Sequence, residues 1–453
     1  MTVARFMITE PKGKQRSSVR HTRAIQRDRT QRPLGAPPAE AVVARLTEIV
    51  HPATLAQVSD FHHLGLRARL LTLPVMVGLI LGLLWRQIGG PTELVRVIHV
   101  EAVPWVPPMR DLTQQALAQR SRTLPADLFN RVLQTILPVL QGRWAARRRP
   151  LPPAVAWATA HFTVVLIADG STLDVLPRKI GLPQDAVKAP LAGRMMALLD
   201  LASRLPRRVW YDADPNGHDA RFGERLLSGI PTGALVLFDL GFTDLARWAT
   251  LTARGATWLT RAKKNLKYEV VKVLVHAAAI RDRIVWIGEG TTRQQVRLIE
   301  VQAHGTVHRY LTNALDLTRL PTAQAVAPYP QRWRVEDAFA IVKRLLGLAY
   351  FHRGAENAIK MQVWATWLLY AVLIDLTDAV AEALAWPFAD LSPAMLYRSL
   401  YFVTHAVAQD STTDPVRYLA DHARELGIIK RPRKPHIPPP TPLVSTLTIA
   451  EIP

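Results

Sequence analysis

Apolar residues at helical spacing dominate the first third of the chain. Between residues 40 and 141 they recur three and four positions apart, and prolines mark the joints between successive runs. This spacing places the apolar side chains on one face of a helix, where they can be buried. The stretch 142–153 then combines a basic cluster with several prolines, which is typical of a break between domains. We therefore expect a helical domain over residues 39–150.

Past this break the pattern changes to short apolar runs rich in β-branched residues. One run, 162–168, ends in Asp169-Gly170-Ser171, and another, 234–238, ends in Asp239-Leu240-Gly241. Continuous apolar runs of this length are typical of strands that are buried on both faces. We expect two central strands, each of which delivers a carboxylate at its C-terminal end. Further strands are predicted over 197–201 and 208–212, and helices over 218–227 and 244–254.

Alternating apolar and basic positions follow over residues 258–315. Alternation with a period of two predicts strands with one face exposed, so we expect a small antiparallel β insertion here. The stretch between Asp239 and Glu336 is much longer than a direct connection from a strand to a helix requires, and the insertion accounts for its length.

The stretch from Tyr329 to Leu346 carries two stripes at helical spacing. At 100° per residue, four polar residues fall within an arc of about 60°: Tyr329, Arg332, Glu336 and Lys343. The apolar residues form a neighbouring stripe: Val335, Phe339, Val342 and Leu346. Pro330 suits a first helical turn, so Tyr329 is expected at the entrance of one helix that packs on the core. The polar stripe fits a phosphodiester-cutting site, and it fits equally an Arg-Glu-Lys salt-bridge ladder on an amphipathic helix. Trp333 lies off this stripe; contact with the core is one reading of it, and no role is assigned to it.

The two ends of the chain and two apolar runs complete the organisation. Residues 1–38 and 428–453 are basic and poor in large apolar residues, so we expect a disordered arm and a disordered proline-rich tail. A helical C-terminal region is predicted over 376–427. The apolar runs 70–85 and 362–385 are predicted to be buried helices, because the first is shorter than the roughly 20 residues that span a bilayer and the second carries several acids.

Composition indicates a polyanionic partner. The chain has 57 Lys and Arg against 36 Asp and Glu, a formal net charge of +21. Its 49% hydrophobic residues exclude a wholly disordered chain. Nucleic acid is the leading candidate partner of a folded, strongly basic protein, although a ribosomal or membrane-surface role also fits the charge. On this reading the domain at 39–150 binds DNA. Cysteine is absent, which excludes disulfides and thiolate metal sites.

Three acids are the candidate chemistry. Asp169 and Asp239 follow two predicted core strands, and Glu336 lies on the predicted helix. Carboxylate oxygens suit Mg²⁺ or Mn²⁺, and two such ions can catalyse in-line phosphoryl transfer. Taken singly, Asp169 also fits a turn and Asp239 a helix cap.

With these residues, the chain resembles the DDE-type bacterial insertion-sequence transposases, specifically the insertion-sequence-four group. That group carries Tyr-x2-Arg-x3-Glu-x6-Lys around its third acid, and the match here is Tyr329, Arg332, Glu336 and Lys343. Asp169-Gly170-Ser171-Thr172 resembles the first motif of the group, and Asp239-Leu240-Gly241-Phe242 resembles the second. Leu240 stands where the group usually has arginine.

The resemblance implies an α/β fold with a ribonuclease-H-like catalytic domain over 151–375, interrupted by the β insertion. It implies that Asp169, Asp239 and Glu336 bind Mg²⁺ or Mn²⁺, two ions per active site, and that Tyr329, Arg332 and Lys343 grip DNA phosphates. A flipped base would stack on an aromatic side chain of the insertion, for which Trp286 is the candidate; packing is the other reading of Trp286.

The function implied is metal-dependent cleavage of DNA at the ends of an element and transfer of the strands into target DNA. The partners would be double-stranded DNA, at terminal inverted repeats and target sites, and a second copy of the chain in a synaptic dimer. A prokaryotic, cytoplasmic, nucleoid-associated protein with no membrane anchor is expected. Three alternatives remain: a ribonuclease-H-like nuclease without strand transfer, a domesticated non-catalytic DNA-binding protein, and a basic protein anchored to a membrane by residues 70–85.

Overall fold

The computed structural model describes seven segments of the chain: 40–66, 69–174, 191–214, 219–303, 305–347, 356–409 and 414–430. The predicted arm at 1–38, and the predicted tail beyond residue 430, lie outside the described residues.

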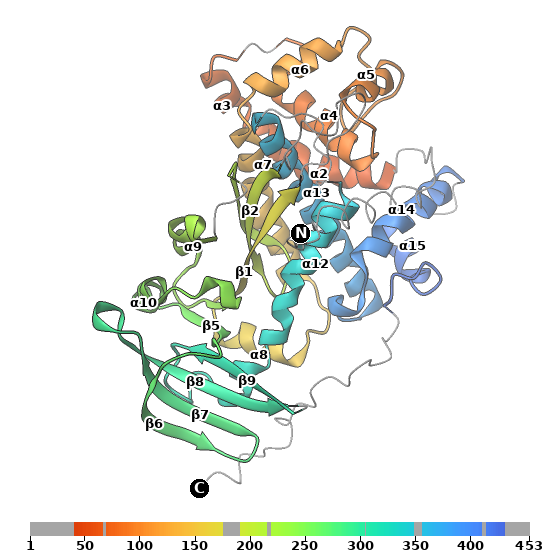
Figure 1. Cartoon of the computed structure of the whole chain (residues 1–453). Coiled ribbons are helices and arrows are strands. Elements are labelled where there is room, and N and C mark those ends of the chain that lie inside the picture. The colour runs from red at the N-terminus through yellow and green to blue at the C-terminus, as the bar shows by residue number, and fades with distance from the viewer. Residues whose placement is uncertain are drawn as a thin grey trace, which may run out of the picture.

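One mixed sheet of nine strands forms the centre of this α/β protein, in the order β3-β2-β1-β4-β5-β9-β8-β7-β6 (Figure 1). The strands are β1 (Val165–Asp174), β2 (Leu191–Asp200), β3 (Pro206–Asp212), β4 (Leu235–Phe238), β5 (Thr257–Arg261), β6 (Glu269–His276), β7 (Ile280–Ile287), β8 (Gln294–Ala303) and β9 (Thr306–Thr312). β1, β4 and β5 pair in parallel, and β2 runs antiparallel to both β1 and β3.

The strands of the predicted insertion continue the central sheet. β6 to β9 are antiparallel to one another, as the alternating pattern indicates. β9 pairs with β5 through Leu259 and Thr312 and through Arg261 and Tyr310. β5 belongs to the parallel core, because it pairs in parallel with β4 and its side chains are buried on both faces from Thr257 to Thr260. Its last four residues had been predicted to lie within the insertion.

Helices cover both faces of the sheet, which explains why its central strands are apolar throughout. On one face lie α9 (Gly223–Gly229) and α10 (Leu245–Ala253), which Figure 1 shows on the opposite side of β1 from α12 (Arg334–Ala340). Leu166 and Val236 belong to the core under α9 and α10. Their neighbours Ile167 and Leu237 belong to the core under α12.

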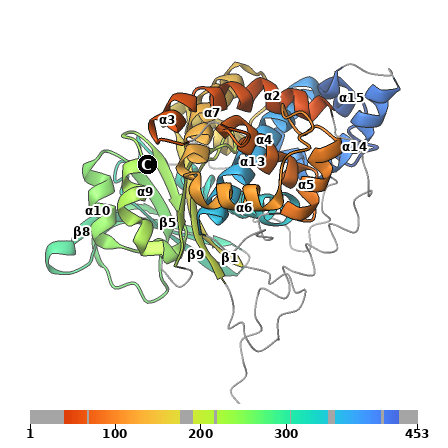
Figure 2. The ribbon, with the colours of Figure 1, turned by 90° about the horizontal axis from the view of Figure 1, so that it is seen from above.

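Most of the remaining helices pack around α13 (Glu356–Leu384). The N-terminal ones are α2 (Glu40–Leu55), α3 (Val58–His63), α4 (Leu73–Trp85), α5 (Pro91–Val100), α6 (Gln114–Thr123), α7 (Asp127–Ala146) and α8 (Pro153–His161), and the later ones are α11 (Thr322–Val326), α14 (Pro393–Ala408) and α15 (Pro415–Asp421). Among them, α2, α4, α6, α7, α14 and α15 contact α13. Figure 2 shows the N-terminal helices gathered beside α13. Buried residues from Val42 to Ile428 form one continuous core. The boundary predicted after residue 375 falls inside α13, which runs through it without a break.

Both apolar runs are buried helices. α4 occupies the first, and α13 the second. By length and composition α13 is apolar enough to cross a membrane, since an 18-residue stretch of it has a mean hydropathy of 1.5. The whole of that stretch, however, is buried inside the protein. α13 is therefore the central helix of a folded core.

The basic, proline-rich stretch at 142–153 does break the helix, since α7 ends at Ala146. Two of its arginines, however, make ion pairs with acids of α13. Arg147 contacts Asp375 at 2.7 Å and Asp378 at 3.0 Å, and Arg149 contacts Asp378 at 2.6 Å. These ion pairs fix the stretch to α13, so it does not behave as a loose linker between domains.

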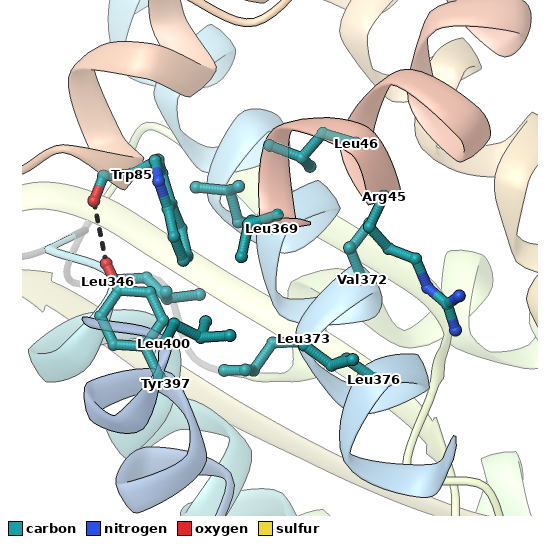
Figure 3. Close-up of a pocket in the computed structure, with 11 residues that line it drawn as sticks. Arg45, Leu46, Trp85, Leu346, Leu369, Val372, Leu373, Leu376, Tyr397 and Leu400 are labelled. Atoms are coloured by element: carbon teal, nitrogen blue, oxygen red, sulfur yellow. Dashed lines mark hydrogen bonds between the residues drawn. The ribbon is translucent and has the colours of Figure 1, made fainter. Parts of the chain in front are cut away.

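A small cavity lies between α2, α4, α13 and α14 (Figure 3). Leu46, Leu369 and Leu373 line it, and the Tyr397 hydroxyl donates a hydrogen bond to the Trp85 carbonyl at 3.0 Å across one end. Its volume is about 10 Å³, which is at the lower limit for one water molecule. We interpret it as a packing gap.

Candidate active site

The first two acids lie at the same edge of the parallel strands. Asp169 was expected at the end of its strand, but β1 continues to Asp174 because it stays paired with β2. Its pairing with β4, in contrast, ends at Ala168 and Phe238. Asp169 therefore lies where β1 and β4 separate, and Asp239 is the first residue after β4. Asp239 precedes the short 3₁₀ turn η3 (Leu240–Phe242), but its side chain makes no capping hydrogen bond.

The third acid lies on a helix of three successive geometries. Residues Tyr329–Trp333 form a 3₁₀ turn (η5), Arg334–Ala340 form α12, and Ile341–Leu345 form a π-helical turn (η6). The prediction of one regular α-helix is wrong in this respect. Pro330, which lacks an N–H group, lies in the tight first turn. The predicted apolar stripe is nevertheless buried, with no member more than 6% exposed: Val335, Phe339, Val342 and Leu346.

One guanidinium brings the three acids together. Arg332 Nη1 lies 3.4 Å from Asp169 Oδ2, and Nη2 lies 3.7 Å from both Asp239 Oδ1 and Glu336 Oε1. Because each lies 3.7 Å from the same nitrogen, Asp239 Oδ1 and Glu336 Oε1 are separated by at most twice that distance. The Arg332 side chain is only 6% exposed, so its charge acts on the carboxylates with little screening by water.

Burial dominates the electrostatics of the first acid. Desolvation raises the pKa of Asp169 to about 6, against the opposing effects of the Gly170 N–H group, which donates to Oδ1 at 2.8 Å, and of Arg332. The charges of Asp239 and Glu336 make smaller contributions to this net rise. The pKa of Glu336 is also raised, first by desolvation. Such perturbed carboxyl groups at the end of a sheet are typical of functional sites.

The oxygen donors of the site fit a divalent ion, but in this structure the three carboxylates surround the guanidinium of Arg332. Three carboxylates supply hard oxygen ligands of the kind that Mg²⁺ and Mn²⁺ prefer. Among the described residues, however, no three His, Asp or Glu side chains stand close enough together to hold a metal ion. Arg332 provides the neutralising positive charge, and its Nε atom is buried without a hydrogen-bond partner.

The three residues predicted to grip phosphates have different surroundings. Arg332 contacts the acids, as described. Lys343 Nζ donates to the Ser171 hydroxyl at 2.9 Å, which keeps this cation beside β1, two residues beyond Asp169. Tyr329 does begin the helix, but it is only 5% exposed, and its hydroxyl donates to the Phe238 carbonyl at 3.1 Å. Burial raises the pKa of Tyr329 to about 12.

Trp286 shares a sheet face with the acids. Cross-strand partners point to the same face, and the pairs run from Ile167 in β1 across the sheet to β7: Ile167, Leu237, Leu259, Thr312, Arg297 and Ile284. Asp169 and Trp286, each two residues further along, therefore share this face. The Trp286 ring is half-buried, with the Arg293 guanidinium 4.9 Å from its centroid.

Trp333 is the residue whose position the pattern did not indicate. Contact with the core was one reading of Trp333, which had no assigned role, and the side chain is 58% exposed. Its place directly after Arg332 is the one signal in the sequence that puts it at the site.

Comparison with known proteins identifies the segment that holds the acids. Residues 160–372 match the family model described as the transposase DDE domain. A protein named as a transposase, y4zB, from Sinorhizobium fredii is 29% identical over 191 residues, which are 40% of this chain and 52% of that protein. A second, from Synechocystis sp. and named for the insertion sequence element IS4SA, is 23% identical over 163 residues, 35% of this chain and 45% of that protein.

The chain thus spans about half the length of the curated relatives it matches. A solved chain from a piggyBac transposase synaptic complex with hairpin DNA aligns over 85% of this chain and 84% of its own length, at 13% identity and a TM-score of 0.36. Asp169, Asp239 and Glu336 all lie within residues 160–372, the segment that matches the family model. This segment matches the family model of the transposase DDE domain and is similar to two proteins named as transposases.

Proposed function

We propose that this chain is a transposase, which cleaves DNA at the ends of its own element and joins the freed 3′-hydroxyl groups to target DNA. The observation that carries the proposal is the convergence of Asp169, Asp239 and Glu336 on Arg332. Three acids from two strands and a helix meet at one edge of the sheet, within the segment that matches the family.

The arrangement of the strands supports a ribonuclease-H-like core. The five strands β3-β2-β1-β4-β5 are contiguous in the sheet, and β2 alone runs antiparallel to the other four. The two acid-bearing strands, β1 and β4, are adjacent and parallel, so their C-terminal ends meet at the same edge. This is where open α/β sheets bind their ligands.

Asp169, Asp239 and Glu336 would hold Mg²⁺ or Mn²⁺, two ions by family analogy. Such ions, when bound, activate the attacking water or 3′-hydroxyl and stabilise the leaving oxygen. Arg332 would then lose the contacts with its three acid partners. A planar guanidinium binds phosphate bidentately, so Arg332 is suited to take a DNA phosphate in exchange. Lys343 adds a second cation, and Trp286 remains a candidate for stacking a flipped base.

DNA is the proposed partner because the chain carries a formal net charge of +21, which favours binding to a phosphate backbone. Two ends of an element have to be joined in one complex, so a homodimer on DNA is proposed by family analogy. The helical part at 39–150 is proposed to contribute to this DNA surface.

The test is cleavage of a plasmid that carries the inverted repeats found on either side of the gene. Glu336→Gln should reduce strand cleavage in Mg²⁺ by about a hundredfold or more, as removal of a group that acts on the transition state does, while DNA binding persists. Asp337→Asn is the matched control: the side chain of Asp337 is 61% exposed and contacts Arg334 at 3.2 Å, so its loss should leave cleavage unchanged.

Each contrary outcome points to a different conclusion. Unchanged cleavage by Glu336→Gln would remove Glu336 from the site. Cleavage by the wild-type chain without joining of the strands would indicate a nuclease. Binding without cleavage would indicate a non-catalytic DNA-binding protein.

A further inference from the structure

Arg204 is a half-buried cation on a strained turn between β2 and β3. Its φ of 62° is a left-handed conformation that glycine or asparagine adopts at lower cost. The Tyr370 hydroxyl donates to the Arg204 carbonyl at 2.9 Å and so helps to hold the turn. Within the described segments no group accepts a hydrogen bond from the Arg204 guanidinium, which lies 5.5 Å from the centroid of the Phe388 ring. A half-buried cation at a strained position, without an acceptor from the protein, is suited to an anionic ligand.

A second cation meets Arg204 on one short turn, η7 (Phe388–Asp390). Lys430 Nζ donates to the Ala389 carbonyl at 2.8 Å, and Ala389 directly follows the phenylalanine that Arg204 contacts. The third cation is Arg334 of α12, whose charge acts on both of the others. Arg204, Arg334 and Lys430 thus form one group, the Arg204 cluster.

The members of the Arg204 cluster repel one another. Desolvation, followed by the charge of Arg334, lowers the pKa of Arg204 to about 10. Desolvation, followed by the charges of Arg334 and Arg204, lowers the pKa of Lys430 to about 8. Two acids oppose these shifts, and both are exposed: Asp337, which contacts Arg334 at 3.2 Å, and Asp390. A bound anion would offset the remaining excess of positive charge.

The Arg204 cluster lies apart from the three acids. Arg334 precedes Glu336 by two residues, a rotation of about 200° around a helix, so the two side chains leave nearly opposite sides of α12. In the sequence, Lys430 is followed by Arg431, Arg433 and Lys434. A cluster that continues into further cations fits a ligand with repeated negative charges.

We propose that Arg204, Arg334 and Lys430 bind a phosphate group of the DNA backbone, on the side of α12 away from Glu336. The assignment of this phosphate to DNA rests on the proposed function. A guanidinium binds phosphate oxygens bidentately, and an ammonium adds a point charge. A free phosphate has the same chemistry, so the experiment has one arm for each source.

The first arm measures binding of the full-length chain to a DNA duplex of arbitrary sequence over a range of KCl concentrations. No divalent metal is added, so no strand is cut. The variant combines Arg204→Asn with Lys430→Gln, because asparagine tolerates the left-handed conformation. The matched control combines Arg96→Gln with Arg417→Gln, which removes two charges from side chains that are 73% and 76% exposed and pair with an acid on their own helix.

The double variant should bind DNA with a weaker dependence on salt. Loss of one phosphate contact lowers the slope of log affinity against log salt concentration by about 0.9. Affinity should fall about ten- to 150-fold, the range for a lost hydrogen bond to a charged group. The control should keep the slope of the wild type. Lys430→Gln alone should show part of the loss, and because this side chain is exposed, the fold does not depend on it.

The second arm measures thermal unfolding in sodium phosphate and in sodium chloride at equal ionic strength. Phosphate should raise the unfolding temperature of the wild type more than that of the double variant, because a ligand that binds the folded state stabilises it.

A slope in the double variant equal to that of the control would overturn the assignment to DNA. If the effect of phosphate on unfolding were lost in the same variant, the cluster would bind a free phosphate instead, and if that effect persisted, the cluster would not be an anion site. A wild-type chain that binds no DNA at any salt concentration would count against the proposed function. In that case, loss of the phosphate effect in the double variant would still establish a site for a free phosphate.

Discussion

At the scale of single residues, the site is a cluster of like charges held together by one cation. Three carboxylates at one edge of a sheet repel one another, and Arg332 offsets that repulsion from a position that is 6% exposed. The cost of the arrangement is visible at Asp169, where burial, with Asp239 and Glu336 adding to it, raises the pKa to about 6 in spite of Arg332. Asp169 is therefore kept at the expense of stability, as is common for functional groups.

Asp169→Asn should stabilise the fold at neutral pH. The folded pKa of about 6 lies above the ordinary value of 3.8, so the folded state binds the proton more tightly and stability falls as pH rises from about 4 to 6. Above pH 6 the full penalty applies, up to about 3 kcal/mol from 1.4 kcal/mol per pKa unit. Thermal unfolding in EDTA should show the variant more stable than wild type at pH 7, and the difference should vanish near pH 4.

The control is Asp337→Asn on the same helix, which should give no comparable gain at pH 7 because the Asp337 side chain is 61% exposed. A wild-type chain more stable than Asp169→Asn at pH 7 would show that the contact with Arg332 outweighs the desolvation of Asp169.

The three acids could be predicted because each follows a local pattern: two apolar runs that end in Asp, and one helical stripe. The role of Arg332 could be predicted only in part. Its spacing of four residues indicates the contact with Glu336, but its contacts with Asp169 and Asp239 depend on how β1 and β4 meet the helix, and no local pattern contains that information.

At the scale of elements, the helix that carries Glu336 is joined to the sheet by its first residue, Tyr329. The Tyr329 hydroxyl donates to Phe238, the last residue of β4, and the Tyr329 ring packs edge-on against Tyr310 of β9, with centroids 5.1 Å apart. Through these contacts the turn η5 holds the end of the strand from which Asp239 projects.

Tyr329→Phe should therefore act on stability rather than on phosphate binding. Loss of one buried hydrogen bond should lower the free energy of unfolding by about 1 to 2 kcal/mol, as measured in urea. Affinity for DNA should change little. Tyr268→Phe, at a residue that is 37% exposed, is the control and should change neither quantity. If the Tyr329→Phe chain instead had normal stability but weaker affinity for DNA, that result would support the predicted contact between Tyr329 and a DNA phosphate.

The central strands were predictable because a short, continuous run of apolar, β-branched residues is typical of a strand buried on both faces. The attachment of β9 to β5 was not, because the pairing of two strands distant in sequence is set by register and edge geometry. The 3₁₀ and π turns around α12 could not be predicted either. The apolar stripe of Val335, Phe339 and Val342 is the same for a regular helix and for this one.

At the scale of the whole molecule, α13 is the element that unites the chain. It packs against helices from both ends of the sequence and shares one core with them. Its acids Asp375 and Asp378, with side chains at most 2% exposed, hold Arg147 and Arg149 of the stretch that follows α7. The boundary predicted from composition at residue 150 could not reveal this, because a basic, proline-rich stretch looks the same whether it is solvated or paired.

Asp378→Ala tests whether the N-terminal helices depend on the part of the chain that carries the three acids. The substitution leaves Arg147 and Arg149, with side chains 11% and 4% exposed, without this carboxylate, and breaking such a buried pair costs about 3 to 5 kcal/mol. Because the core is shared, calorimetry should show one unfolding transition that moves as a whole to lower temperature. Glu382→Ala removes a half-exposed carboxylate that lies 3.8 Å from Arg147 and accepts a hydrogen bond from the Arg148 N–H group at 2.8 Å, so its effect should stay below about 2 kcal/mol. Two transitions, of which one moves and the other does not, would instead show that the helical part at 39–150 folds as an independent domain.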